Sequence, residues 1–464
     1  MKQIRRILML SGVLLLTGCN GPEQQETVPE SETALLQETE GETQEDLAFV
    51  QAEEGDFNAV SENGRVMITA YTGKAQAIEI PSEINGEPVC EIGESCFQET
   101  DLTGIILPDS VTRIGDGSFY GCESLVQVVL PEGLEEIGIH AFAGCSKLQQ
   151  IQIPRTVKQI GMYAFNASGL SSVVLPEGIA RVEAGTFQAC TNLVSVTLPE
   201  GISGIGEDAF YNCTALEELN LPEDIADMGS RCITNTPWYE AYCEKLGDGF
   251  VVFGDALYGW SGKADGTLPS VKTICSYAFT GNDTLTDVVI PDSVEVIGNY
   301  AFSECSSLKS VIIPDSVTVL GAGVFYNSGA LEQVHLPEQL AALSDGLFAE
   351  CLALRTVNLP EKITEIPRNC FTMCYSLNDI TLPESVTAIR SQAFAACLDL
   401  EEIYLPETVT VVESLAFAYS SYTTVNCQAE QRPAEWAEDW CGTEEDDNMC
   451  TVNWGVTQVT DMQQ

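Results

Sequence analysis

Cysteine is the residue type of this chain whose spacing most readily suggests chemistry. Two explanations are open for the cysteines that recur about every 23 residues or at multiples of that step: disulfides between neighbouring repeats, or buried free thiols. We favour free thiols, because stacked side chains that point the same way give a poor disulfide torsion. No CxxC pair occurs, so we expect no metal site. The recurring cysteines are Cys122, Cys145, Cys190, Cys213, Cys305, Cys351, Cys374 and Cys397.

Acid–base catalysis has little support in the sequence. The only two histidines, His140 and His335, lie in different halves of the chain, so we do not expect them to share a centre. The acidic run 444–447 lacks the alternating ligand spacing of an EF-hand and is interpreted as a solvated loop. We therefore expect no catalytic residue, no cofactor and no enzyme activity.

The start of the chain has the pattern of an export signal. A basic start and an apolar segment from Ile7 to Leu16 lie within residues 1–18, and this segment is too short to cross about 30 Å of hydrocarbon. The sequence LTGC that ends at Cys19 resembles the bacterial lipobox, which implies that the Cys19 thiol carries a diacylglycerol. An ordinary secretory cleavage is the alternative. We expect an extracytoplasmic protein, anchored to the cell membrane by lipid alone and exposed at the surface.

Charge excludes one class of partner. The formal net charge of −49 rules against nucleic acid, whose backbone is bound by clustered Lys and Arg. The hydrophobic fraction of 45% is nevertheless that of a folded body. Residues 20–56 contain many Glu, Gln and Thr and no Lys or Arg, so residues 19–56 are predicted to be a lipidated cysteine followed by an acidic, disordered tether.

An internal repeat indicates the architecture of the rest. Prolines recur at a step of 23 residues, or 22 in two places, with one break, and phenylalanines keep the same register. The prolines are Pro108, Pro131, Pro154, Pro176, Pro199, Pro222, Pro269, Pro291, Pro314, Pro337, Pro360, Pro383 and Pro406. The phenylalanines are Phe119, Phe142, Phe165, Phe187, Phe210, Phe279, Phe302, Phe325, Phe348, Phe371, Phe394 and Phe417.

One unit, residues 125–145, shows what each repeat contributes. Its first half alternates inward and outward positions and ends at Pro131, which predicts a short strand. Its second half carries apolar residues from Ile137 to Cys145 at the spacing of a short helical turn. We predict an α/β leucine-rich-repeat solenoid of ~23-residue units, with a parallel sheet on one face and short helical or irregular segments on the other.

The repeat pattern, L-x-x-V-x-L-P-x-x-V-x-x-I-G-x-x-A-F-x-x-C, resembles the BspA-like (Treponema pallidum type) leucine-rich repeats from about Phe57 to Cys427. The resemblance implies a solenoid and an association with adhesion to host matrix and to other bacteria. Ser168, Ser328 and Ser420 replace the final cysteine in three repeats. We infer that this position faces the interior, where a thiol or hydroxyl can cap backbone groups.

Breaks in the repeat divide the chain. We expect a first array with an N-terminal cap at 57–235, an aromatic hairpin insertion at 236–266, a second array at 267–427, and a C-terminal cap and tail at 428–464. The insertion carries Trp238 and Trp260 among other aromatics, which either stack on a carbohydrate or pack the junction between the arrays; we favour packing.

The leading functional hypothesis is a cell-surface binding protein whose outward strand residues bind a protein or glycan ligand. The candidates on this face are Glu218, Asn220, Asp379, Glu402 and Tyr404. The alternatives are a glycan-capture lipoprotein that uses Trp238 and Trp260, and a purely structural envelope protein.

Overall fold

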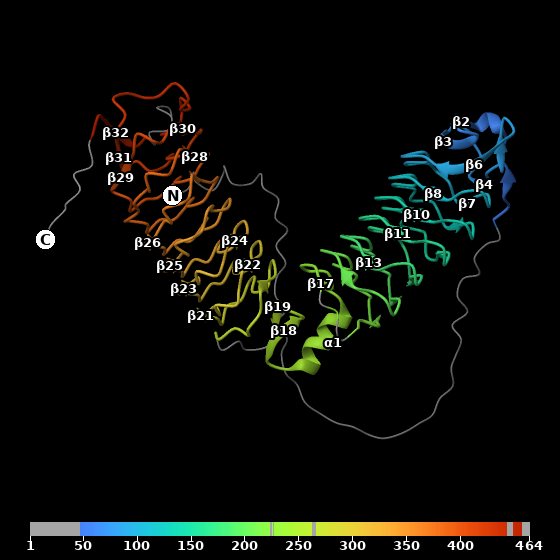
Figure 1. The fold of residues 1–464 in the computed structure, drawn as a ribbon, viewed down its shortest axis with the longest axis horizontal. Helices are drawn as coiled ribbons and strands as arrows, with labels where there is room; N and C mark the ends of the chain where they lie inside the picture. The colour runs from blue at the N-terminus through green and yellow to red at the C-terminus, as the bar shows by residue number, and fades with distance from the viewer. Residues whose placement is uncertain (1–46, 223–224, 226, 262–265, 443–448, 457–464) are drawn as a thin grey trace, which may run out of the picture. The chain divides into compact units, whose positions relative to one another are not determined.

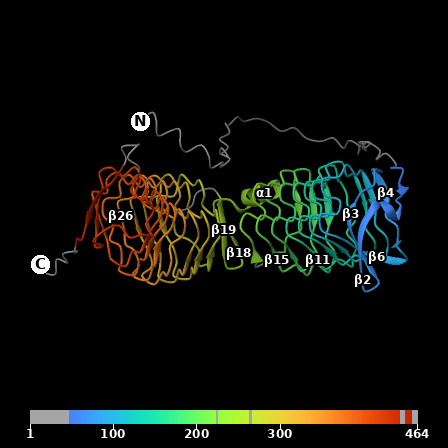
Figure 2. The same cartoon turned by 90° about the horizontal axis from the view of Figure 1, so that it is seen from above.

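The computed structural model describes residues 47–222, 225, 227–261, 266–442 and 449–456, which form stacked coils (Figures 1 and 2). Parallel strands of successive coils pair one repeat apart, so the predicted leucine-rich-repeat solenoid is confirmed. The expected signal peptide, residues 1–18, the lipidation site Cys19 and most of the tether lie outside the described residues.

The first ladder is the sheet that the sequence predicts. Val288 of one strand is in register with Val311 of the next, and Val311 with Val334, so each coil buries the same central side chain. Its strands are β1 (Val50–Gln51), β4 (Ala77–Glu79), β7 (Gly104–Ile106), β9 (Gln127–Val129), β12 (Ser172–Val174), β14 (Ser195–Thr197), β16 (Glu218–Leu219), β21 (Asp287–Val289), β23 (Ser310–Ile312), β25 (Gln333–His335), β26 (Thr356–Val357), β29 (Glu402–Leu405), β31 (Thr424–Cys427) and β32 (Thr451–Trp454).

A second ladder of parallel strands was not predicted. Ile137, which we expected on a helical turn, lies in β10, where its N–H and C=O belong to pairing between coils. The strands of the second ladder are β6 (Glu87–Ile92), β8 (Arg113–Ile114), β10 (Glu136–Ile137), β11 (Gln159–Ile160), β13 (Arg181–Val182), β15 (Gly204–Ile205), β17 (Asp227–Met228), β20 (Thr273–Ile274), β22 (Val296–Ile297), β24 (Val319–Leu320), β27 (Glu365–Ile366), β28 (Ala388–Ile389) and β30 (Val411–Val412).

The remaining side of each coil is an irregular turn and not a helix. Alternate N–H groups bond within the coil and to the next one: Ala143 donates to His140 O at 3.1 Å, whereas Phe142 donates to Ala164 O at 2.7 Å. An α-helix would keep these donors within its own segment. The alternation brings two left-handed residues into the coil, here His140 (φ 53°) and Gly144 (φ 76°). The helical option is therefore wrong, and the irregular one is confirmed.

The folded body starts earlier than expected. Val50 and Gln51 of β1 pair with Ile78 and Glu79 of β4, and a 3₁₀ turn follows at Glu54–Asp56, so the end of the predicted tether is part of the solenoid. Residues 50–51 form a strand because they pair with β4, and the acidic composition of the segment did not indicate this pairing. The N-terminal cap is completed by the hairpin of β2 (Phe57–Glu62) and β3 (Arg65–Tyr71) and by β5 (Glu83–Ile84).

The insertion contains the expected hairpin and an unexpected helix (Figure 1). Strands β18 (Gly249–Phe253) and β19 (Ala256–Ser261) pair antiparallel, which confirms the hairpin. The helix α1 (Pro237–Leu246) begins after Thr236, whose hydroxyl accepts a hydrogen bond from the Tyr239 N–H at 3.1 Å. A threonine N-cap followed by Pro237 at the first helical position is a helix-start signal, although only the hairpin was predicted for this insertion.

Candidate functional site

The recurring cysteines form an interior column with a structural role. Each thiol donates to the carbonyl oxygen of the phenylalanine one coil earlier, as Cys351 does to Phe325 at 3.0 Å. Ser328 repeats the contact with Phe302 at 2.8 Å. All eight cysteines are buried and free, which confirms the expectation of capping thiols. Burial raises the pKa of the Cys305 thiol to about 12, so this thiol is a poor nucleophile.

The outward residues of the first ladder were the predicted ligand-binding positions. Glu218, Asp379 and Glu402 are exposed, and Tyr404 is half-buried. They come from several coils, so the ladder distributes them along a row and does not gather them into one cluster. Such a surface is suited to an extended contact and not to enclosing a small molecule.

Asn220 has a partner already. Its side-chain amide donates to Leu198 O at 2.9 Å, and its Oδ1 accepts the Leu198 N–H at 2.6 Å. Asn358 holds Leu336 in the same way, at 3.1 and 2.9 Å. The asparagine amide thus continues the ladder by one residue where the backbone pairing stops. A ligand would have to compete with this contact for the Asn220 amide.

Exposed apolar side chains were not among the predicted site residues. Val289 is 64% exposed and Ile312 is 68% exposed, and they are partners in neighbouring strands β21 and β23. We call these two residues the apolar stripe. Exposed His335 continues their column in β25. A hydrophobic residue at the outward position of the period-2 pattern was the available sequence signal.

A line of carboxylates runs beside the apolar stripe in the second array. Each carboxylate follows the proline that ends its strand, and all are exposed. None forms an ion pair within the described ranges. We call this set the acidic row: Asp292, Asp315, Glu338, Glu361, Glu384 and Glu407.

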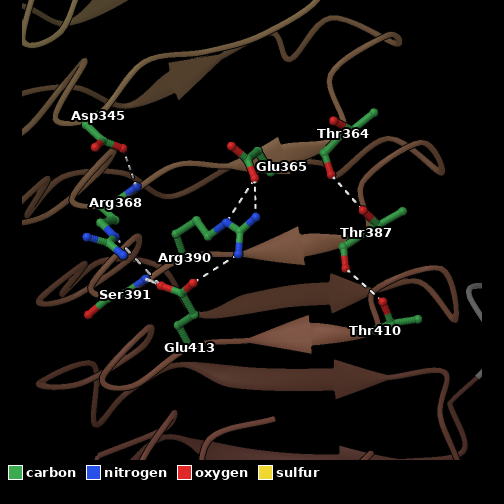
Figure 3. Close-up of polar contacts among 9 residues, drawn as sticks. All are labelled: Asp345, Thr364, Glu365, Arg368, Thr387, Arg390, Ser391, Thr410 and Glu413. Carbon is green, nitrogen blue, oxygen red and sulfur yellow. Dashed lines mark hydrogen bonds and ion pairs between the residues drawn. The ribbon is translucent and has the colours of Figure 1, made fainter. Parts of the chain in front are cut away.

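Carboxylates on the second ladder are neutralised instead. The Arg390 guanidinium binds Glu365 at 2.6 Å and Glu413 at 3.0 Å, and the Ser391 N–H also donates to Glu413 (Figure 3). Burial alone would raise the pKa of Glu413, but the Ser391 N–H and the arginine together lower it. Arg113 likewise lies between two glutamates of its neighbouring strands. The negative charges of these second-ladder glutamates are thus compensated by arginines of the same protein.

A family comparison identifies the repeat. The model of the BspA type leucine rich repeat region matches residues 90–180, 114–240, 272–374 and 297–425, which is more than half of the chain. The protein belongs to this family. A search of curated proteins found no match.

Solved structures of bacterial leucine-rich-repeat proteins are similar to this BspA-type chain. A leucine rich cell surface protein from Faecalibacterium prausnitzii is 27% identical, covers 88% of this chain and 98% of its own, and gives a TM-score of 0.45. A leucine-rich repeat protein from Eubacterium ventriosum is 21% identical over 82% of this chain and 94% of its own, with a TM-score of 0.47.

The aromatic residues that interrupt the BspA-type repeats pack the junction. Trp238 stacks on Tyr242 at 5.5 Å, and both contact the core of the first array. Trp260 pairs with Phe250 across the hairpin and contacts the core of the second array. The two tryptophans thus contact different cores, and both are half-buried. This arrangement matches the favoured packing interpretation more closely than a shared carbohydrate platform.

Two side chains replace the missing coil at this junction. The Tyr258 hydroxyl accepts the buried Ile233 N–H at 3.0 Å, where a regular coil would offer a carbonyl. Arg231 lies over the rings of Tyr211 and Tyr277, at 4.6 and 4.4 Å, and binds Asp208 at 2.7 Å. Neither role was predicted from the sequence, because both depend on contacts between different coils.

The remaining chemical candidates have structural surroundings. His140 stacks on Tyr163 at 5.0 Å in the turn segment, whereas His335 is exposed on the first ladder. In the described ranges, no group of three or more His, Cys, Asp or Glu is arranged to hold a metal, and no helix is long and apolar enough to span a membrane. Cys441 and Cys450 form a disulfide in the C-terminal cap. Neither cysteine occupies the recurring position of the repeat, and this difference was the sequence signal available for a disulfide.

Proposed function

We propose that this protein binds a macromolecular ligand through the outward face of its first ladder. The observation that carries the proposal is the row of exposed side chains on the hydrogen-bonded strands of the first ladder, which includes the apolar stripe. Solenoid sheets offer extended surfaces of this kind. No enzyme family is indicated, and the BspA-type repeat is typically a binding scaffold.

We propose further that the binding surface is displayed outside the cell on a lipid anchor at Cys19. The support is the sequence LTGC after a short apolar segment, together with the repeat family. Adhesion to host matrix or to other cells is the role that the family resemblance implies for such a display. Glycan capture through Trp238 and Trp260 has weaker support, because both indoles contact the cores.

The test uses the soluble chain without residues 1–19 as bait, followed by binding assays on the recovered ligand. We expect Asp379→Ala or Tyr404→Ala to weaken binding while the melting temperature stays nearly unchanged, because these side chains lie outside the core. Glu402 accepts a hydrogen bond from the buried Asn426 amide, so Glu402→Ala would also remove an internal contact. Normal binding by every first-ladder variant, with loss in Trp238→Ala or Trp260→Ala, would contradict the proposal and favour the insertion.

A further inference from the structure

We propose that the apolar stripe and the acidic row together form a docking surface for a basic protein segment that carries apolar side chains. This proposal rests on the proposed function. It adds the chemical class of the partner and the part of the first ladder that would bind it. Both features belong to the second array, and both are exposed.

The apolar half of this surface is Val289 and Ile312. Both side chains are about two-thirds exposed, and their strands are hydrogen-bonded neighbours. The two side chains therefore expose adjacent apolar area to water. Burying such area on a partner is favourable by about 25 cal/mol per Å². On the first array, Ile106 and Val129 are likewise in register, but Ile106 is half-buried and Val129 is 40% exposed. The second array therefore offers the more exposed apolar contact.

The charged half is the acidic row. Asp292 follows Val289 by three residues, so at most about 11 Å of chain separates the row from the stripe. Successive coils repeat the carboxylate at the strand spacing of ~4.8 Å. Lys362, which neighbours Glu361, donates to Gln339 and not to a row carboxylate. Asp315 accepts the Glu338 N–H at 3.1 Å, but among the described residues no Lys or Arg forms an ion pair with the row.

The contrast between the two ladders supports binding by an external cation. On the second ladder, Arg390 and Arg113 each hold two carboxylates, so the protein supplies its own counter-charges there. In the part of the chain that the structure describes, the outward positions of the first-ladder strands contain no Lys or Arg. Lys309 and Arg355 lie one residue before β23 and β26. Complementary Lys or Arg would steer a partner to the unpaired face.

Apolar contact next to unpaired carboxylates favours protein over the other ligand classes. A polyanion would be repelled by the acidic row, and a neutral glycan would make no ion pair with the carboxylates of the row. A basic segment that alternates Lys with an apolar residue would satisfy both halves at once, since side chains of an extended chain point alternately to opposite sides.

The direct test measures the affinity of the folded protein for two fluorescent synthetic peptides, one alternating Lys with Val and one alternating Lys with Ser. We expect the Lys–Val peptide to bind more tightly. The combined variant Asp292→Asn, Asp315→Asn, Glu338→Gln should weaken it by about tenfold or more, with a shallower dependence on salt. Ile312→Ser should weaken the Lys–Val peptide and leave the Lys–Ser peptide unchanged.

The matched control removes three negative charges from the turn side of the same array, with Asp283→Asn, Glu304→Gln and Asp399→Asn. It should bind both peptides as the wild type does. Equal losses in the control and the row variant, or equal affinity for the two peptides, would overturn the inference. If row variants bind the peptides normally while Tyr404→Ala still loses the natural ligand, the inference falls and the proposed function stands.

Discussion

At the scale of single residues, backbone satisfaction explains why this chain tolerates so many cysteines. Each recurring thiol donates a hydrogen bond to a phenylalanine carbonyl of the preceding coil, and the hydroxyls of Ser328 and Ser420 make the same contact. A buried group that only needs to donate one hydrogen bond to the preceding coil can be a thiol or a hydroxyl. This position of the repeat therefore requires a small side chain that can donate a hydrogen bond, and either cysteine or serine meets that requirement.

Buried thiols give a pH dependence of known sign. The unfolded chain ionises its cysteines near pH 8.5, whereas burial raises the pKa of thiols such as Cys305 and Cys427 to about 12. The folded state then holds more protons, so the stability is present below pH 8.5 and falls as the pH rises towards 12. Denaturant unfolding at pH 7.5 and 10 should show this fall.

The control for the thiol prediction is chemical labelling at neutral pH. Labelling of the recurring cysteines should be slow in the folded protein and fast after denaturation without reductant, because the thiols are free but buried. Disulfides joining Cys351, Cys374 and Cys397, detected by mass spectrometry, would refute this account of the column.

The asparagines of the first ladder make a second prediction. Asn358→Ala removes two hydrogen bonds to Leu336 and should lower the free energy of unfolding by about 1–2 kcal/mol. Thr381→Ala, at the equivalent position of the next coil, is the control and should change stability by less than about 0.5 kcal/mol. Equal effects in thermal melts would show that the amide bridge contributes nothing.

At the scale of elements, the junction shows how a solenoid can continue past a missing coil. The Tyr258 hydroxyl makes a contact that a backbone carbonyl makes elsewhere, and the Arg231 guanidinium lies over turn-segment rings as His140 stacks on Tyr163 in the first array. The two arrays are thereby linked by side chains over this turn. Ser230 adds to the link by accepting the Ser276 N–H at 3.1 Å.

Tyr258→Phe tests this link. The substitution leaves the buried Ile233 N–H without its acceptor, which should cost about 1–3 kcal/mol. Tyr404→Phe removes a hydroxyl from the first-ladder face and serves as the control. Hydrogen exchange of the Ile233 amide should accelerate in the Tyr258 variant alone; unchanged protection there would contradict the bridging role.

The elements also show what the sequence could predict. Alternation before each proline predicted the first ladder correctly, because a period of two is specific to strands. The apolar spacing from Ile137 to Cys145 resembled a helix, yet those residues divide between a second strand and a left-handed turn. Spacing reports which side chains face inward, and it does not report whether N–H groups bond within a coil or between coils.

At the scale of the whole molecule, stability depends on stacks of phenylalanine rings, with centroids 5.0–5.5 Å apart in the first array and 5.0–5.9 Å apart in the second. Phe302 is fully buried in such a stack, so Phe302→Ala should cost about 3–5 kcal/mol through the cavity it leaves. Calorimetry should show this loss, and binding should decline only in parallel with unfolding. A binding loss in fully folded protein would place the ligand elsewhere than the first-ladder face.

The binding surface could be predicted only in part. The outward positions follow from strand period, and Glu218, Asp379 and Glu402 are exposed as expected. The engagement of Asn220 and the contrast between unpaired and arginine-paired carboxylates both depend on which coils are neighbours. Residues one or two repeats apart in sequence meet in space, and single-repeat patterns do not contain that information.

The most direct measurement of the central claim is site-specific cross-linking of the ligand recovered with the soluble chain. A photo-reactive amino acid would replace Ile312 on the first ladder in one variant, exposed Thr364 just before β27 of the second ladder in another, and Trp260 in a third (Figure 3 shows Thr364). We predict that the ligand cross-links from position 312 and not from 364 or 260. Cross-linking from 364 or 260 with none from 312 would contradict binding by the first-ladder face.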